Sequence, residues 1–156
     1  MDAIQYRNEV VANRRQHGFD AVDEYTNDFD PVWVRREVDD SIGEVAIFVT
    51  LVEQSALEPD DVSAVADEFR TVLVEQVEDR QEATTPIGYV TFAVADPDPS
   101  LVEAARSYTV ARRRTNVFPI VFDVETETLH RHEIPRLKGR GIYRRQAEDA
   151  ARLFEV

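Results

Sequence analysis

The chain lacks several features that define common classes of protein. It has no cysteine, so neither a disulfide framework nor a thiolate metal site can form, and a reducing compartment suits it. The first residues, MDAIQYRNEVV, contain no apolar stretch as long as a signal peptide needs. The longest apolar run, 45–52, is interrupted only by Thr50 and is too short to cross a bilayer. These absences predict a cytoplasmic protein with no membrane anchor.

Glycine is also scarce, with five residues in the chain. There is no P-loop, no G-x-G-x-x-G and no G-x-S-x-G motif, so backbone cradles for nucleotide phosphates are not expected. Segment 88–122 resembles restriction-endonuclease-like nucleases in its strand–helix–strand order. Their acid-x-Lys motif is absent, because the only lysine, Lys138, lies two residues after Arg136 instead of after an acid. The likeness is one of topology and assigns no family.

Lysine is almost absent, and acids far outnumber bases. Asp and Glu total 31 against 18 Lys and Arg, 17 of which are Arg, so the formal charge is −13. Such a charge repels itself in dilute buffer, whereas molar salt shortens the Debye length to about 3 Å and relieves the repulsion. The composition predicts the protein of a salt-accumulating microbe, which folds cooperatively in molar KCl. An ordinary acidic protein is the alternative interpretation.

The basic residues are concentrated in one part of the chain. Segment 106–145 holds ten of them and four acids, a net of +6, which leaves −19 for the rest. This asymmetry is the main functional signal in the sequence. Its candidate anion- or partner-binding residues are Arg112, Arg113, Arg114, Arg136, Lys138, Arg140, Arg144 and Arg145.

Two groups of these bases have different interpretations. Arg112–Arg114 is expected at the end of a helix, where the dipole favours cations. The run 136–145 opens a helix, where the dipole disfavours positive charge, so we expect a compensating partner. That partner is an acidic surface of this chain or of a second copy, or a small anion such as phosphate, which Arg side chains bind well. Nucleic acid is the weaker candidate, since a net −19 elsewhere repels a polyanion.

Hydrophobic periodicity divides the chain into helices and strands. Helical spacing of apolar residues predicts helices over 3–17, 58–79, 101–114 and 142–154, with a further short helix considered over 19–29. Nearly continuous apolar runs predict strands that are buried on both faces over 44–52, 87–95 and 116–124. Alternating segments predict hairpin arms at the sheet edges over 32–38 and 128–134, and 135–141 is a basic loop.

The order of these elements, α-ββ-α-β-α-ββ-α, predicts a single α/β domain over 1–156. Its central β-α-β-α-β alternation favours parallel strands joined by right-handed crossovers, in a mixed sheet of roughly five strands with helices packed on it. An α+β fold with a mostly antiparallel sheet is the alternative. Pro119 lies inside the third apolar strand and counts against a fully central position for that strand.

Acidic residues follow the three apolar strands at the ends where ligands bind in open α/β sheets. They are Glu53, Asp96, Asp98, Asp123 and Glu125. If they converge, the last four predict a Mg²⁺ or Mn²⁺ site of the kind that phosphoryl-transfer enzymes use. The alternative is that these acids serve turns and helix starts, since Asp-Pro-Asp-Pro suits both.

His130 and His132 stand two residues apart on an expected strand, so their side chains point to one face. That spacing can present two imidazoles to Zn²⁺, although no cysteine is available as a third ligand. A solvated strand face is the alternative interpretation of the same pattern.

Two functions are therefore predicted from different classes. The first is a non-catalytic binding or interaction module without a cofactor, expected as a homodimer or with a protein partner, that uses the basic region. The alternative is a metal-dependent nuclease or phosphoryl-transfer enzyme, with the four carboxylates as ligands and the arginines holding phosphate.

Overall fold

The computed structural model of the chain describes residues 1–22, 29, 31–54, 56–78, 84–136 and 140–156. Its helices are α1 (Ala3–Gln16), α2 (Pro59–Glu78), α3 (Pro99–Ser107) and α4 (Arg140–Leu153). Its strands are β1 (Asp20–Ala21), β2 (Trp33–Asp39), β3 (Gly43–Val52), β4 (Thr85–Val94), β5 (Ala111–Arg112), β6 (Thr115–Asp123) and β7 (Thr128–His130). No helix among the described residues has the length and apolar character needed to cross a membrane.

The strands form one mixed sheet in the order β1-β2-β3-β4-β6-β5, with β7 also paired with β6. The three central strands β3, β4 and β6 run parallel, while β2 pairs antiparallel with β3, and β5 and β7 pair antiparallel with β6. The predicted α/β fold with a mixed sheet is confirmed. The additional strands β1 and β5 have two residues each.

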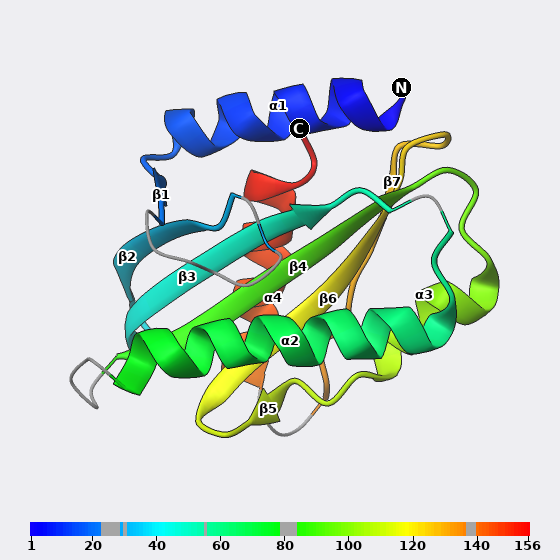
Figure 1. Cartoon of the computed structure of the whole chain (residues 1–156). Coiled ribbons are helices and arrows are strands. Elements are labelled where there is room, and N and C mark those ends of the chain that lie inside the picture. Colours follow the sequence, from blue (N-terminus) through cyan, green and yellow to red (C-terminus); the bar gives the residue numbers. More distant parts are fainter. Residues whose placement is uncertain (23–28, 30, 55, 79–83, 137–139) are drawn as a thin grey trace.

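Helices cover both faces of the sheet, with α2 and α3 in front of it in Figure 1, α4 behind it and α1 along one end. Because β3, β4 and β6 are apolar at nearly every position, each strand contributes side chains to two separate cores. Phe69 and Leu73 of α2 pack in the front core with residues such as Phe92. Leu153 and Phe154 close the opposite core.

Gly88 shows how closely α2 approaches the sheet. A Cβ atom at this position of β4 would lie 2.9 Å from side-chain atoms of both Leu73 and Phe69. That distance is shorter than real Cβ contacts, so glycine allows the helix and the strand to pack at their observed separation.

The helix ends follow the sequence signals with one difference. At α1, Asp2 and Gln5 form a reciprocal capping box, and Gly18 takes a left-handed φ of 74° just after the helix. At α3, the Ser100–Glu103 pattern indicates a cap at Ser100. The cap is instead Asp98, which accepts a hydrogen bond from the Ser100 backbone with Pro99 in the first turn.

Two further expectations about elements are wrong, and a third is contradicted at the residues that the structure describes. The helix predicted over 101–114 ends at Ser107, and the chain then forms the β5–β6 hairpin. The arm predicted over 128–134 is a strand only over Thr128–His130. In the segment considered for a short helix, residues 20 and 21 pair with β2 instead, and 23–28 lie outside the described residues.

Pro119 does not prevent β6 from holding a central position. β6 pairs with β4 along one edge. On its other edge, Thr115–Asn116 pairs with β5 and Val121–Asp123 pairs with β7. Pro119 lies in the interval between these two short pairings, where the strand tolerates a residue without an N–H.

Candidate functional site

The carboxylates of the predicted metal site include Asp123, whose hydrogen bonds support the fold. Asp123 is buried, and its Oδ1 accepts from the backbone N–H groups of Glu125 at 2.9 Å, Thr126 at 3.3 Å and Asp96 at 3.3 Å. Burial raises the pKa of Asp123, but these hydrogen bonds outweigh it and keep the pKa below its usual value. Asp123 therefore stays ionised while it fastens the β6–β7 turn to the loop after β4.

The other acids of this edge are dispersed. Asp98 caps α3, Glu53 pairs with Arg7 at 3.1 Å, and Asp96 and Glu125 are exposed. In the described part of the chain there is no group of three or more His, Asp or Glu side chains that could hold a metal ion. Asp96 is brought next to Asp123 through its backbone, but the predicted four-carboxylate cluster does not form among these residues.

The two histidines occupy different environments. His130 ends β7 and is partly buried, whereas His132 lies beyond the strand and is 5% exposed. The His132 Nε2 lies 3.1 Å from the carbonyl oxygen of Tyr108, and its ring meets Phe118 edge to face. A carbonyl only accepts, so Nε2 carries the proton. Burial lowers the pKa of His132, and the ring is a neutral core group at neutral pH.

Arg145, one of the predicted partner-binding residues, is buried within an ion network. Its guanidinium lies 2.8 Å from Glu37, 3.2 Å from Asp39 and 2.9 Å from Asp149. Burial alone lowers the pKa of Arg145, but these carboxylates outweigh it and raise the pKa above its usual value. The compensating partner predicted for this base is therefore internal, and it comes from β2 and from α4 itself.

The same network reaches the central strand. Tyr89 of β4 donates its hydroxyl to Asp149 at 2.7 Å, and Arg152 pairs with Asp149 at 3.0 Å and with Glu37 at 2.8 Å. Arg144, which precedes Arg145 in α4, pairs with Glu148 at 3.1 Å and donates to the Ser41 hydroxyl at 2.8 Å. These contacts fasten α4 to the sheet, so Arg144 and Arg145 serve the fold.

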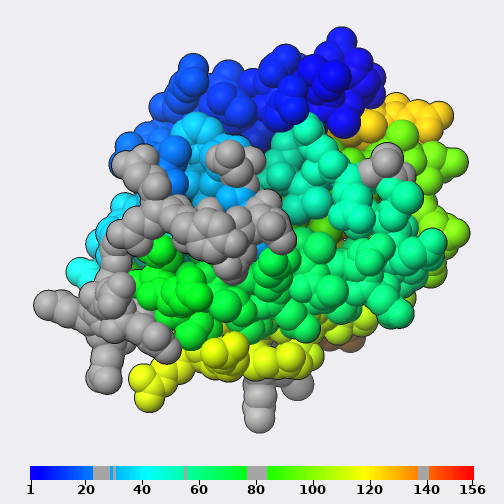
Figure 2. Space-filling model, viewed as in Figure 1, coloured from blue at the N-terminus to red at the C-terminus, as the bar shows by residue number. Residues whose placement is uncertain are grey.

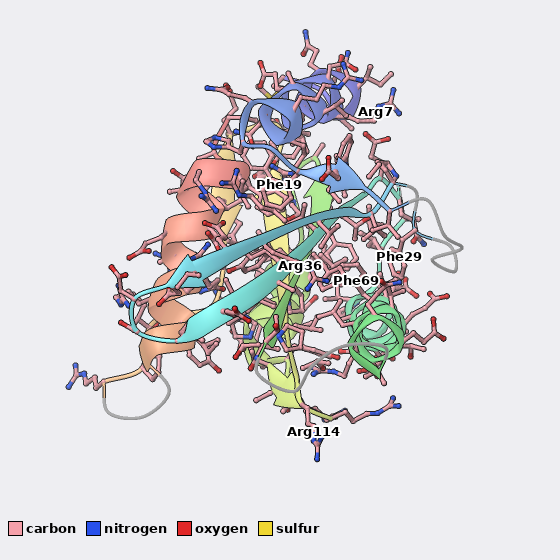
Figure 3. All side chains as sticks on the ribbon, turned by 90° about the vertical axis from the view of Figure 1, so that its left-hand side faces the viewer. Arg7, Phe19, Phe29, Arg36, Phe69 and Arg114 are labelled. Carbon is pink, nitrogen blue, oxygen red and sulfur yellow. The ribbon has the colours of Figure 1, made fainter. Side chains whose placement is uncertain are left out.

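Arg112–Arg114, here called the arginine tip, lies at the turn of the β5–β6 hairpin and not at a helix end. Ala111 pairs with Asn116 and Arg112 with Thr115, which leaves Arg113 and Arg114 as the two turn residues, with φ of 53° and 61°. Such a turn favours Asn-Gly, and a left-handed backbone costs about 1–2 kcal/mol at each ordinary residue. All three arginines are exposed, and Figure 3 shows Arg114 pointing away from the molecule.

The hairpin is held by a buried cation from α2. Arg70 is 2% exposed, and its guanidinium donates to the carbonyl oxygens of Thr109 and Val110 at 2.8 Å, of Arg112 at 2.9 Å and of Thr115 at 3.2 Å. It also donates to the Thr115 hydroxyl at 2.8 Å. A single side chain thereby satisfies four carbonyls of the hairpin from beneath it.

A second contact joins α2 to the chain before the hairpin. The Tyr108 hydroxyl donates to Asp67 at 2.6 Å, and the Arg70 guanidinium lies 5.5 Å from the centre of the Tyr108 ring. Arg112 lies 4.0 Å from Asp67, whereas no described residue pairs with the side chains of Arg113 and Arg114. The turn is therefore anchored, and its two outermost cations have no ion-pair partner among the described residues.

Of the remaining predicted bases, Arg136 and Arg140 lie near the start of α4. Arg136 is exposed, Arg140 is the first residue of the helix, and Lys138 lies outside the described residues. In Figure 1 the start of α4 and strand β5 lie at the same end of the molecule. This is the end where the parallel strands begin, opposite to the predicted carboxylate site.

A pocket of about 580 Å³ opens at the other end, where β3, β4 and β6 finish beside the start of α1. Its apolar lining includes Ala93 and Val124, both buried, while the acids that line it are exposed. These acids are Asp2, Glu53 and Glu125. We call this the carboxyl-edge pocket. Its position is the one where ligands bind in open α/β sheets, and its volume is in the range of ligand sites.

Arg14 is a second buried cation that sequence reasoning missed. It lines a smaller cavity of about 120 Å³ beneath α1, and its guanidinium donates to the Leu153 carbonyl at 2.6 Å and faces the Phe154 ring at 4.5 Å. Burial lowers the pKa of Arg14 to about 10, so the group remains charged near neutral pH.

The sequence contains a signal for the burial of Arg70 but none for the ion network around Arg145. Arg70 follows Val62 and Ala66 at helical spacing, so it falls on the apolar face of α2, where a cation needs buried acceptors. Glu37 and Asp39 gave no such signal, because an alternating edge strand is expected to carry charges.

The chain is thus a three-layer α/β protein with a mixed sheet, an anchored arginine tip at one end and an acid-lined pocket at the other. Comparison with protein-family models, curated proteins and solved structures finds no match.

Proposed function

We propose that this protein is a non-catalytic interaction module that docks its arginine tip on an acidic surface of a protein partner. The observation that carries the proposal is the anchoring of the hairpin by the buried Arg70, which donates to four of its carbonyls. A solvated loop that carried charge only for solubility would need no buried cation beneath it, nor two arginines in a left-handed turn.

The chemistry of the tip selects carboxylates. Arg113 and Arg114 present planar guanidinium groups, which bind carboxylates in pairs of parallel hydrogen bonds. They are exposed positive groups on a chain whose formal charge is −13, so they give an acidic partner a local point of attraction. The same net charge disfavours a nucleic acid, which is negative along its whole length.

We also propose that the module works in the cytoplasm of a salt-accumulating cell. The support is compositional: 31 acids, one lysine and no cysteine. In molar salt, long-range attraction is screened, so docking depends on contact between Arg side chains and carboxylates and on the apolar Arg stems.

Site-specific photocrosslinking in the cells that produce the protein tests the proposal. The photoreactive residue benzoylphenylalanine replaces Ala111, which is exposed beside the turn, or Ala12, an exposed alanine of α1 that serves as the matched control. We expect a discrete crosslinked product from position 111 alone, and its loss on Arg113→Glu/Arg114→Glu. Identical products from both positions, or products that survive charge reversal, contradict the proposal.

A further inference from the structure

The two ends of the molecule have complementary chemistry. The arginine tip projects where the parallel strands begin, and the carboxyl-edge pocket opens where they end. Figure 3 shows this separation, with Arg114 at one extreme and Arg7, which pairs with the pocket residue Glu53, at the other. In Figure 2 the hairpin, coloured yellow, protrudes from the lower edge, while α1, coloured blue, covers the upper edge.

We propose that the carboxyl-edge pocket receives the arginine tip of a second copy of this chain, so that copies associate head to tail. The inference rests on the proposed function and names the partner of the tip. Its basis is charge complementarity between Arg113 and Arg114 on one copy and the acids of the pocket on the next.

The pocket offers carboxylates that are free to accept. Glu125 is exposed and has no ion pair with any described residue, and Asp2 uses one oxygen to cap α1. Glu53 pairs with Arg7 in an exposed contact, which contributes little by itself and can be exchanged for a contact with an incoming guanidinium. Two arginines in adjacent turn positions therefore meet up to three carboxylates.

The apolar lining supplies the remaining part of the fit. An arginine buries its aliphatic stem against apolar surface while its charged end stays among polar groups. Ala93, Val94 and Val124 provide such a surface behind the acids. At about 580 Å³ the pocket lies within the range that holds drug-sized ligands, so it has room for side chains of the tip.

The position of the two surfaces determines the form of the assembly. Because the tip and the pocket lie at opposite ends, we expect each copy to insert its tip into one neighbour and to receive the tip of another. The contact is heterologous, and repeated contacts build rings or open chains instead of a closed twofold dimer. The proposed head-to-tail association differs from the closed homodimer expected from the sequence.

Complementary disabled variants test the inference, with oligomeric state measured by sedimentation velocity in molar KCl. The tip variant is Arg113→Glu/Arg114→Glu, with Arg106→Glu, a charge reversal at an exposed position of α3, as its control. The pocket variant is Ala95→Trp/Glu125→Gln, which fills the pocket and removes a carboxylate without adding a cation that the reversed tip could bind, with Glu127→Gln as a control outside the pocket lining. Circular dichroism of each variant verifies that its fold is retained.

We expect the wild type and both controls to form concentration-dependent species larger than a dimer, and each disabled variant alone to be monomeric. An equimolar mixture of the two disabled variants retains one intact tip and one intact pocket, so it forms a one-to-one dimer and grows no further. The dissociation constant for self-association of the tip variant is expected to exceed that of the mixed dimer by at least about tenfold.

Four results overturn the inference. The first is a mixture that stays monomeric, and the second is wild-type oligomers that persist in either disabled variant. The third is a monomeric wild type whose melting midpoint rises with butylguanidine, which assigns the pocket to a small cation instead. Crosslinking at position 111 to another protein, with a monomeric wild type, refutes head-to-tail association while leaving the proposed function intact.

Discussion

At the scale of single residues, two buried arginines contact backbone carbonyls and aromatic rings, whereas the usual partners of a buried arginine are carboxylates. Arg70 donates to backbone carbonyls that lie 39 to 45 positions further along the chain, and Arg14 contacts a carbonyl and an aromatic ring. Arginine suits this because its five N–H donors have a fixed geometry and its charge is weakly hydrated.

Replacing Arg70 tests its anchoring role. Arg70→Met keeps an unbranched stem but leaves four carbonyls of the hairpin without this donor, so the free energy of unfolding is expected to fall by about 3–5 kcal/mol. Chemical unfolding in molar KCl measures it. Arg15→Met, at an exposed position of α1, serves as the control, and an equal small change in both variants refutes the role.

His132 predicts a specific dependence on pH. Its burial lowers the pKa in the folded protein below the 6.5 of the unfolded chain, so the unfolded state binds the proton more readily. Stability is therefore complete above 6.5 and declines as the pH falls below it. His132→Gln keeps a donor for the Tyr108 carbonyl but does not titrate, so the wild type should lose stability relative to this variant on acidification. Parallel curves for the two proteins between neutral pH and pH values below 6.5 contradict the assignment.

At the scale of elements, the close packing of α2 on β4 can be tested with one substitution at two positions. Gly88→Ala places a Cβ 2.9 Å from Leu73 and Phe69, and such overpacking is expected to cost about 1–3 kcal/mol. At Gly141 in α4 the nearest atom, from Ile42, is 3.9 Å away, so Gly141→Ala should be neutral or stabilising. Thermal melts compare the variants, and equal effects at both positions would show that α2 does not pack as described.

The sequence was sufficient for the elements whose pattern is local. Strands β3, β4 and β6 are apolar runs of strand length, and α2 keeps its helical period for 20 residues, so their types and order could be predicted. The hairpin after α3 could not. Leu101, Ala105 and Tyr108 continue a helical pattern toward the arginines, and what holds the chain in a hairpin is Arg70, a residue distant in sequence.

The candidate site was predictable in part for the same reason. Composition alone separates a basic segment from an acidic remainder, and the arginine tip is one part of it. The sequence could not show that Arg145 forms ion pairs inside a buried network, because its partners Glu37 and Asp39 lie on a strand distant in sequence. It also placed metal ligands where Asp98 and Asp123 bind backbone N–H groups.

At the scale of the whole molecule, the formal charge of −13 predicts that the stability of the fold depends on salt. We expect a cooperative thermal melt in molar KCl and progressive loss of structure as the salt is removed, since screening of the acidic surface is lost. Circular dichroism melts across a KCl series measure this. A melting midpoint that does not change with salt would assign the composition to an ordinary acidic protein.

The central claim is that the arginine tip is an interaction surface. Crosslinking from position 111, with Arg113 and Arg114 present or both replaced by Glu, tests it most directly. The account predicts a discrete product that requires Arg113 and Arg114, survives Arg106→Glu, and is absent when the photoreactive group is at position 12. A product that is unchanged after reversal of both turn arginines would contradict the account.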